Sequence, residues 1–261
     1  MLFSHIHVSE IQREAELPLK ITIVQHVVGR DLAENQSRME AAIELASPGD
    51  WLIFPEGVLS GYFPDDEQFL QTLDPIKVEE AISEIEKRIA ARGCHCIFGS
   101  ATFSDNAWRN TVITATANGQ SHRYHKIELS ALDRLRFSPG SVSEVIQAGD
   151  LTIGVLACRE LLFPAMWSKL KQAGAQIVFH INNAIQPHDR IWSHIFITRA
   201  IEQGIFVCSV NNGSPPQELA SYLVAPSGAV ILKTTPGQDS IVSAHIDISD
   251  SIIDLATRTD F

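Results

Sequence analysis

Short apolar runs alternate with amphipathic stretches along this chain, and this order restricts the fold more than any other feature of the sequence. In the second half, apolar runs at 151–157, 176–181 and 205–210 are separated by stretches of helical periodicity at 163–173 and 189–203. Strands that are buried on both faces have nearly continuous apolar runs, and the helices that cover them carry one apolar stripe. The pattern predicts a layered α/β fold with mixed β-sheets.

The first half of the chain has the same order, with hairpins inserted in both halves. Asn118-Gly119 is a strong signal for a tight hairpin turn, and Pro226-Ser227-Gly228 marks a second hairpin. The other expected elements are strands at 20–28, 51–54, 94–103, 108–117, 120–126, 222–225, 229–233 and 241–246, and helices at 31–46 and 75–91.

Length, composition and charge indicate a single globular domain that acts on a small molecule. The chain has 261 residues, of which 45% are hydrophobic, and we expect residues 1–18 to be an N-terminal extension and 19–261 to be one domain. A formal net charge of −11 disfavours nucleic acid and anionic membranes as partners. No apolar run approaches the ~18–20 residues that span a bilayer.

The four cysteines are too few for a disulfide framework, so we expect a reducing, cytoplasmic location. Cys94-His95-Cys96 leads into a predicted strand, where residues two apart share a face and pack as core atoms. No second cysteine pair completes a zinc site, so we expect no metal there. Cys208, inside an apolar run, is expected in the core.

Cys158 directly follows the predicted strand 151–157, and a helix is expected to begin just after it. A thiol at such a strand-to-helix corner lies beside backbone N–H groups that favour negative charge. The position suits a nucleophile, although most free cysteines are buried structural residues. The partners of the thiol therefore decide between the two interpretations.

Two other predicted strand ends carry the partners that a nucleophilic thiol needs. Glu56 follows the strand 51–54, and Lys126 ends the strand 120–126. Alone, each is more simply explained as a structural carboxylate or a solvated lysine. Together they form a coherent set, because an ammonium favours the thiolate and a carboxylate accepts its proton. Lys126 and the N–H of Arg159 would then stabilise a developing oxyanion.

Four segments, taken in order, match the motifs of one known family. They are Phe54-Pro55-Glu56 with Gly61-Tyr62; Tyr124-His125-Lys126 followed by Phe137-Ser138-Pro139-Gly140; Cys158 with Phe163-Pro164; and Trp192, Arg199-Ala200-Ile201-Glu202-Gln203 and Asn211-Asn212. Each motif alone is weak evidence, whereas four in this order are specific. From about Lys20 to Asp247 the chain resembles the nitrilase superfamily of carbon–nitrogen hydrolases.

This resemblance implies a fold, a site and a reaction. The fold is a four-layer αββα sandwich with two mixed β-sheets, paired with a second subunit as a homodimer or higher homo-oligomer. The site is a Glu56, Lys126 and Cys158 triad with the backbone N–H of Arg159 as oxyanion donor, and neither a cofactor nor a metal is expected. The reaction is cleavage of a non-peptide carbon–nitrogen bond in a small linear amide through a cysteine thioester, with release of ammonia or an amine. Since little follows the last predicted strand, the chain resembles the amidase-like branch.

The sequence also departs from the family pattern near the lysine. Many members have a second glutamate where this chain has Asp133, a histidine where it has Glu128, and an aspartate where it has Glu160. These differences leave the triad intact but prevent transfer of a substrate from relatives. Loops after the predicted strands should supply substrate contacts, and the candidates are Tyr62, Asp133, Asn182 and Asn183.

Other functions compete with an amidase. A nitrilase or an N-carbamoyl amino acid hydrolase would use the same three residues, and a non-catalytic binding or scaffold protein would share the fold. A metal hydrolase would need His180, His188 and His194 with Asp189, but these spacings match no compact helical ligand pair. We expect these histidines to be packing or surface residues.

Overall fold

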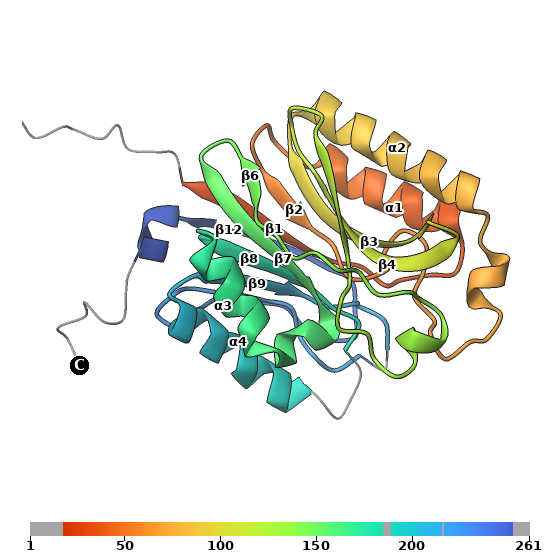
Figure 1. Ribbon diagram of the computed structural model, residues 1–261. Helices are drawn as coiled ribbons and strands as arrows, with labels where there is room; N and C mark the ends of the chain where they lie inside the picture. The colour runs from red at the N-terminus through yellow and green to blue at the C-terminus, as the bar shows by residue number, and fades with distance from the viewer. Residues whose placement is uncertain (1–17, 185–188, 216, 253–261) are drawn as a thin grey trace, which may run out of the picture.

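The computed structural model describes residues 18–184, 189–215 and 217–252, which form two β-sheets packed face to face between two pairs of helices. One pair of helices covers the outer face of each sheet (Figure 1). Each sheet has six strands and contains both parallel and antiparallel neighbours. The four-layer αββα sandwich with two mixed β-sheets, as predicted from the sequence, is therefore confirmed.

The first sheet has the strand order β12-β1-β2-β3-β4-β5. Its strands are β1 (Leu19–Gln25), β2 (Trp51–Ile53), β3 (His95–Ser104), β4 (Ala107–Ala115), β5 (Ser121–His125) and β12 (Ser240–Ile246). The pairs β1–β2 and β2–β3 are parallel, whereas β3–β4, β4–β5 and β1–β12 are antiparallel. Strands β2 and β5 consequently run in the same direction, and their carboxyl ends lie at the same edge of the sheet.

The second sheet has the order β11-β10-β9-β8-β7-β6. Its strands are β6 (Ile146–Ala148), β7 (Leu151–Ala157), β8 (Ile177–Ile181), β9 (Phe206–Val210), β10 (Tyr222–Val224) and β11 (Val230–Lys233). Parallel pairing of β7, β8 and β9 brings the carboxyl ends of these three strands together. In open α/β sheets, this is the edge at which ligands bind.

The strands are apolar on both faces because each sheet lies between its partner sheet and a helix layer. In β1, Ile21 and Ile23 pack in the core between the sheets, whereas Val24 packs under the helices. In β3, Ile97 faces the other sheet and Phe98 faces the helices. Because successive side chains of a strand point to opposite faces, each strand contributes to the core between the sheets and to the core under the helices.

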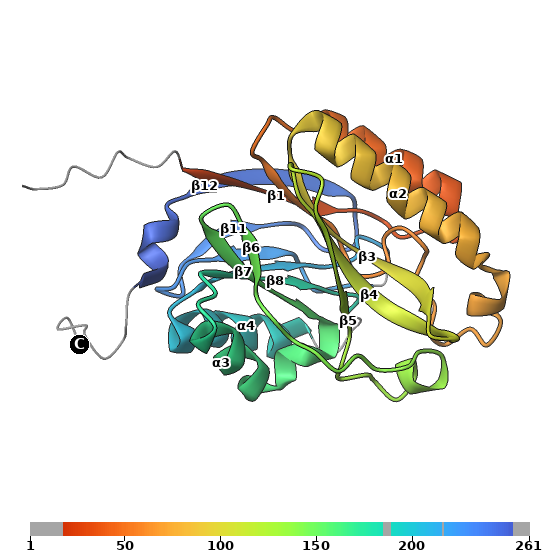
Figure 2. The ribbon, with the colours of Figure 1, turned by 45° about the horizontal axis from the view of Figure 1, so that its top comes forward.

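Helices α1 (Leu32–Glu44) and α2 (Pro75–Arg92) lie side by side over the first sheet (Figure 2). The side chains of Asp31 and Asp74 cap them by accepting hydrogen bonds from backbone N–H groups in the first turn. Gly93 ends α2 in the left-handed conformation that glycine adopts without strain. Helices α3 (Pro164–Gln172) and α4 (Asp189–Gln203) cover the second sheet (Figure 1).

The structure differs from the sequence expectation directly after Cys158. In place of a helix that starts at once, a 3₁₀ turn, η3 (Cys158–Leu162), precedes α3. Proline disfavours the helical conformation in the residue before it, and Phe163 indeed has φ −110° and ψ 88°. Pro164 then opens a new helix.

Four further short elements escaped the sequence analysis because each has only a few residues. They are strand β6 and the 3₁₀ turns η1 (Phe69–Thr72), η2 (Asp133–Leu135) and η4 (Ile248–Ile252). Residues 1–17 of the expected N-terminal extension lie outside the described residues, and the single-domain span 19–261 stays a prediction. Among the described residues, no helix has the length and apolar character needed to cross a membrane.

Candidate active site

Strand ends from both sheets supply the chemistry-bearing residues. Glu56 follows β2, Lys126 follows β5 and Cys158 follows β7. The sheets are joined at this edge, because the Glu56 N–H donates a hydrogen bond to the Asn182 carbonyl, with N and O 3.3 Å apart. Gly99 on β3 allows the Glu56 loop to pack closely, since a Cβ there would meet the backbone of Glu56 and Gly57.

A buried lysine lies between two buried carboxylates. Lys126 Nζ is 2.9 Å from Glu56 Oε1 and 2.9 Å from Asp133 Oδ2, and all three side chains are fully buried. Glu56 Oε1 also accepts a 2.8 Å hydrogen bond from Asn110 Nδ2 on β4. Within the described residues, Glu56 Oε2 has no hydrogen-bond partner. One carboxylate oxygen is thus fixed, and the other remains available for proton transfer.

Burial and charge set the protonation of this cluster. Burial raises the pKa of Glu56 and outweighs the opposing charge of Lys126. Burial lowers the pKa of Lys126, but Glu56 and its other neighbours more than compensate, and this pKa ends well above its ordinary value. Burial also raises the pKa of Asp133, yet Lys126 and Tyr62 hold it below its ordinary value. Lys126 is therefore a stable cation, and Glu56 is the more basic carboxylate.

Tyr62 and Asp133, both candidates for substrate contact, bind each other. The Tyr62 hydroxyl donates to Asp133 Oδ1. Asp133 Oδ2 accepts from Lys126 and, at 3.2 Å, from the Ser130 N–H. Asp133 thus occupies the position beside the lysine at which the family resemblance places a second glutamate, while contact of either residue with substrate stays a prediction.

Cys158 is the first residue of η3 and is partly exposed. Its backbone has φ 49°, a left-handed conformation that costs a non-glycine residue about 1–2 kcal/mol. Burial raises the pKa of its thiol well above the ordinary value; the charge of Glu56 raises it further, whereas Lys126 and the Asn183 backbone lower it. The thiol is therefore protonated at rest and needs a base before it can attack.

The turn that carries Cys158 is fastened by the side chain of Glu160. Glu160 Oε2 accepts from the Ala157 N–H at 2.8 Å. Glu160 Oε1 accepts from the Tyr124 hydroxyl at 2.6 Å and from the Ile127 N–H at 2.7 Å. The sequence marked Glu160 as an acid two residues after the thiol, but its bridging role depends on contacts that no sequence pattern displays.

Asn182 and Asn183 follow β8 and have different surroundings. Asn182 is buried, and its Nδ2 lies 3.0 Å from His180 Nδ1 and 2.7 Å from Ser209 Oγ. Asn183 is partly exposed, and its Oδ1 accepts from Asn212 Nδ2 at 3.0 Å and Gln217 Nε2 at 2.7 Å. Their predicted contact with substrate stays a prediction.

Two histidines of the metal alternative lie among the described residues, on different elements. His180 is buried on β8, whereas His194 lies exposed on α4. His188 is outside the described residues, as is the side chain of Asp189. In the part of the chain that the structure describes, no three histidine, cysteine or acidic residues are grouped as metal ligands.

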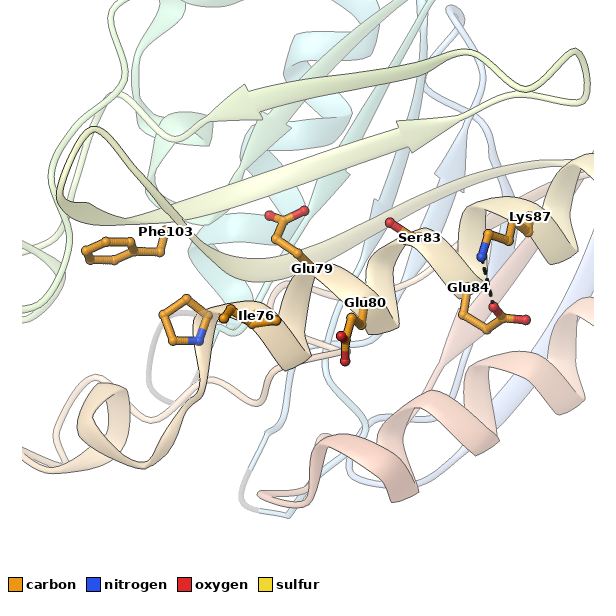
Figure 3. A pocket seen from close by; sticks show the side chains of 8 residues that line it. Ile76, Glu79, Glu80, Ser83, Glu84, Lys87 and Phe103 are labelled. Atoms are coloured by element: carbon orange, nitrogen blue, oxygen red, sulfur yellow. Dashed lines mark hydrogen bonds and ion pairs between the residues drawn. The ribbon is translucent and has the colours of Figure 1, made fainter.

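A surface hollow on the outer side of α2 is separate from these residues. Its lining includes Ile76, Glu79, Glu80, Glu84 and Phe103 (Figure 3). None of the site residues predicted from the sequence lines it. The hollow is therefore formed by other residues than those at the strand ends.

Comparison with known proteins agrees with this architecture. The family model described as carbon-nitrogen hydrolase matches residues 20–252. An (R)-stereoselective amidase from Pseudomonas sp. is 28% identical over 231 residues, which cover 85% of this chain and 82% of that relative. The 2-oxoglutaramate amidase of Bacillus subtilis (strain 168) is 29% identical, with 84% and 86% covered. A nitrilase from Pyrococcus abyssi is 22% identical, with 82% and 84% covered.

Solved structures share the fold. An amidase from Nesterenkonia sp. AN1, in a mutant form that shows covalent addition of the acetamide moiety of fluoroacetamide at the active site cysteine, superposes with a TM-score of 0.81. It is 21% identical, and the match covers 93% of this chain and 94% of that one. A second mutant of the same amidase gives a TM-score of 0.80 at 19% identity. With the family model matching nearly the whole described fold, the chain belongs to the carbon-nitrogen hydrolase family of the nitrilase superfamily.

Proposed function

We propose that this protein hydrolyses a small linear amide through a thioester on Cys158, with Glu56 as the base and Lys126 as the fixed cation. The observation that carries the proposal is the ammonium of Lys126, held 2.9 Å from Glu56 Oε1 at a strand end that Glu160 joins to the Cys158 turn. The amidase names of two relatives and the cysteine adduct of the Nesterenkonia enzyme support the same reaction class.

The first half of the reaction forms the acyl-enzyme. Because burial raises the pKa of the Cys158 thiol, the thiol must lose its proton, and Glu56 accepts it. The thiolate adds to the amide carbon, and the carbonyl oxygen becomes an oxyanion that Lys126 and the Arg159 N–H stabilise. The tetrahedral intermediate collapses as the C–N bond breaks, Glu56 returns its proton to the nitrogen, and ammonia leaves.

The second half hydrolyses the thioester. Glu56, again ionised, takes a proton from water as the water oxygen adds to the thioester carbon. The second oxyanion collapses, the C–S bond breaks, and the sulfur regains the proton from Glu56. The products are a carboxylic acid and ammonia, and the enzyme returns to its starting protonation state.

Ammonia release tests this function directly. Purified protein is screened against simple aliphatic amides, ω-amides, N-carbamoyl amino acids and nitriles. We expect turnover of at least one amide, loss of that turnover in Cys158→Ala, and its retention in Cys96→Ala, a matched change at a cysteine buried in the helix-side core. Hydrolysis retained by folded Cys158→Ala would overturn the mechanism, and turnover of nitriles alone would replace the amide as substrate.

A further inference from the structure

The turn η3, which carries Cys158, has three carbonyls that accept hydrogen bonds from buried side chains. The Cys158 carbonyl lies 2.9 Å from His180 Nε2 on β8. The Glu160 carbonyl accepts from Trp167 Nε1 on α3 at 3.2 Å, and the Leu161 carbonyl accepts from the Arg199 guanidinium on α4 at 3.4 Å. The proposed reaction uses none of these donors, but their hydrogen bonds anchor the backbone of the turn to β8, α3 and α4.

The surroundings of His180 define which of its nitrogens carries hydrogen. A carbonyl oxygen can only accept, so Nε2, which faces the Cys158 carbonyl, must be the N–H. Nδ1 is then an acceptor, and it lies 3.1 Å from Ser209 Oγ and 3.0 Å from Asn182 Nδ2, both of which can donate. Burial lowers the pKa of His180 to about 4, so the ring is neutral around pH 7. The ring is a fixed single donor aimed at the nucleophile's own carbonyl.

The Cys158 carbonyl and the Arg159 N–H belong to the same peptide group. A trans peptide is planar, so its C=O and N–H point in opposite directions. A donor that holds the Cys158 carbonyl therefore also fixes the direction of the Arg159 N–H on the other side of the plane. The restraint on this peptide is needed because Cys158 has φ 49°. Without restraint, a non-glycine residue would relax from this left-handed conformation to a more favourable one.

We propose that His180 is a positioning residue for the oxyanion site: by holding the Cys158 carbonyl, it aims the Arg159 N–H at the oxygen that becomes negative. The inference rests on the proposed function, since it takes Cys158 as nucleophile and the Arg159 N–H as oxyanion donor. His180 touches neither substrate nor sulfur in this scheme and acts only through the peptide that it anchors.

Two reagents that attack the same sulfur separate oxyanion stabilisation from thiol reactivity. With p-nitrophenyl acetate, the thiolate adds to the carbonyl carbon, an oxyanion forms, and p-nitrophenolate leaves as the thioester is made. With iodoacetamide, the thiolate displaces iodide directly and no oxyanion forms. The ratio of the two rates at Cys158, followed by mass spectrometry, reports the oxyanion site alone. Neither reagent requires knowledge of the natural substrate.

The variants differ in whether a donor reaches the Cys158 carbonyl. His180→Gln places an amide NH₂ near the position of Nε2, whereas His180→Asn is shorter and His180→Leu has no donor. Val178→Ala, a buried change on the same strand, controls for general loss of stability. We expect acetylation to slow on the order of 10²-fold in His180→Leu and His180→Asn, the effect typical of losing one oxyanion donor. The alkylation rate should stay within about threefold of wild type. Acetylation of His180→Gln should be at least tenfold faster than acetylation of His180→Leu or His180→Asn.

The outcomes keep the two proposals apart. Equal acetylation-to-alkylation ratios in wild type, His180→Gln and His180→Asn would overturn the role of His180 while leaving Cys158 as the nucleophile. A parallel fall of both rates in folded variants would also overturn it, because the change would then lie in the thiol and not in the oxyanion site. If wild-type Cys158 reacts with neither reagent and no amide is hydrolysed, the proposed function fails and the role of His180 fails with it.

Discussion

The carboxylate of Glu160 and the backbone N–H of Ile127 form a 2.7 Å hydrogen bond that joins the Cys158 turn to the strand end carrying Lys126. The same carboxylate accepts from the Ala157 N–H, directly before the thiol. One buried side chain therefore fixes the spacing between residues that lie on different sheets.

Glu160→Gln should destabilise the protein and reduce its turnover. A glutamine has one acceptor oxygen where Glu160 uses two, so its NH₂ group would face the N–H or hydroxyl donors that the carboxylate now satisfies. We expect the free energy of unfolding to fall by about 2–4 kcal/mol, in the range for a broken buried hydrogen-bond network. Urea denaturation measures the change, with the exposed Glu84→Gln as control. A variant that unfolds at the wild-type urea concentration would show that Glu160 does not fasten the turn.

Asp133 should be required beside Lys126 and should not be freely exchanged for glutamate. Asp133→Asn removes a negative charge 2.9 Å from the ammonium, and Asp133→Glu adds a methylene to a fully buried cluster. The first change lowers the pKa of Lys126, and the second costs about 1–3 kcal/mol through overpacking. We expect kcat/KM for the best amide to fall at least tenfold in Asp133→Asn, or about 1.4 kcal/mol of transition-state stabilisation.

The control for Asp133 is Asp65→Asn, an isosteric change at an exposed loop position. If both Asp133→Asn and Asp133→Glu turn over like wild type, Asp133 is a bystander. In that case the 2.9 Å contact with Lys126 would be structural only.

The order of strands and helices could be predicted because each element carries its signal locally, whereas the four-layer arrangement was implied by the family resemblance. The strand 151–157 and the helix 189–203 were placed to the residue. An apolar run such as 151–157 can be recognised without knowledge of its neighbours in the sheet. Strand ends are equally local, so Glu56, Lys126 and Cys158 could be singled out as candidates.

The roles of partners contributed from within strands could not be recognised in this way. Asn110 lies within β4 and His180 within β8, where a polar residue has the same sequence context whether it binds a catalytic group or merely fills space. Their importance comes from strand pairing, which places Asn110 beside Glu56 and His180 under Cys158. Which residues of two distant strands lie opposite each other depends on the tertiary structure, and it cannot be derived from a single sequence.

Asn110→Leu should move the acidic limb of the kcat/KM profile to higher pH. Asn110 Nδ2 donates to Glu56 Oε1 at 2.8 Å, which favours the ionised carboxylate. Without this donor the ionised carboxylate is less stable relative to the protonated one, so the pKa of Glu56 rises further above its ordinary value. Glu56 then becomes available as a base only at higher pH. We expect a shift of about one pH unit. Thr114→Val, a buried change on the same strand, is the control, and a limb that stays in place or moves to lower pH would contradict the assignment of Glu56 as the base.

His180 should make the protein less stable in acid. Burial lowers its pKa to about 4 from 6.5, with Lys126 acting in the same direction and the bond to the Cys158 carbonyl opposing both. Between these values the unfolded chain binds more protons than the folded one, so stability is complete above pH 6.5 and is lost as the pH falls toward 4. His180→Gln cannot titrate, and the stability of wild type relative to this variant should fall by about 3 kcal/mol between pH 7.5 and pH 4. The pKa of His26 is likewise lowered to about 4, but His26 is present in both proteins and cancels in the difference. A difference in unfolding free energy that stays constant over this pH range would mean that His180 does not lie neutral and buried beneath the nucleophile.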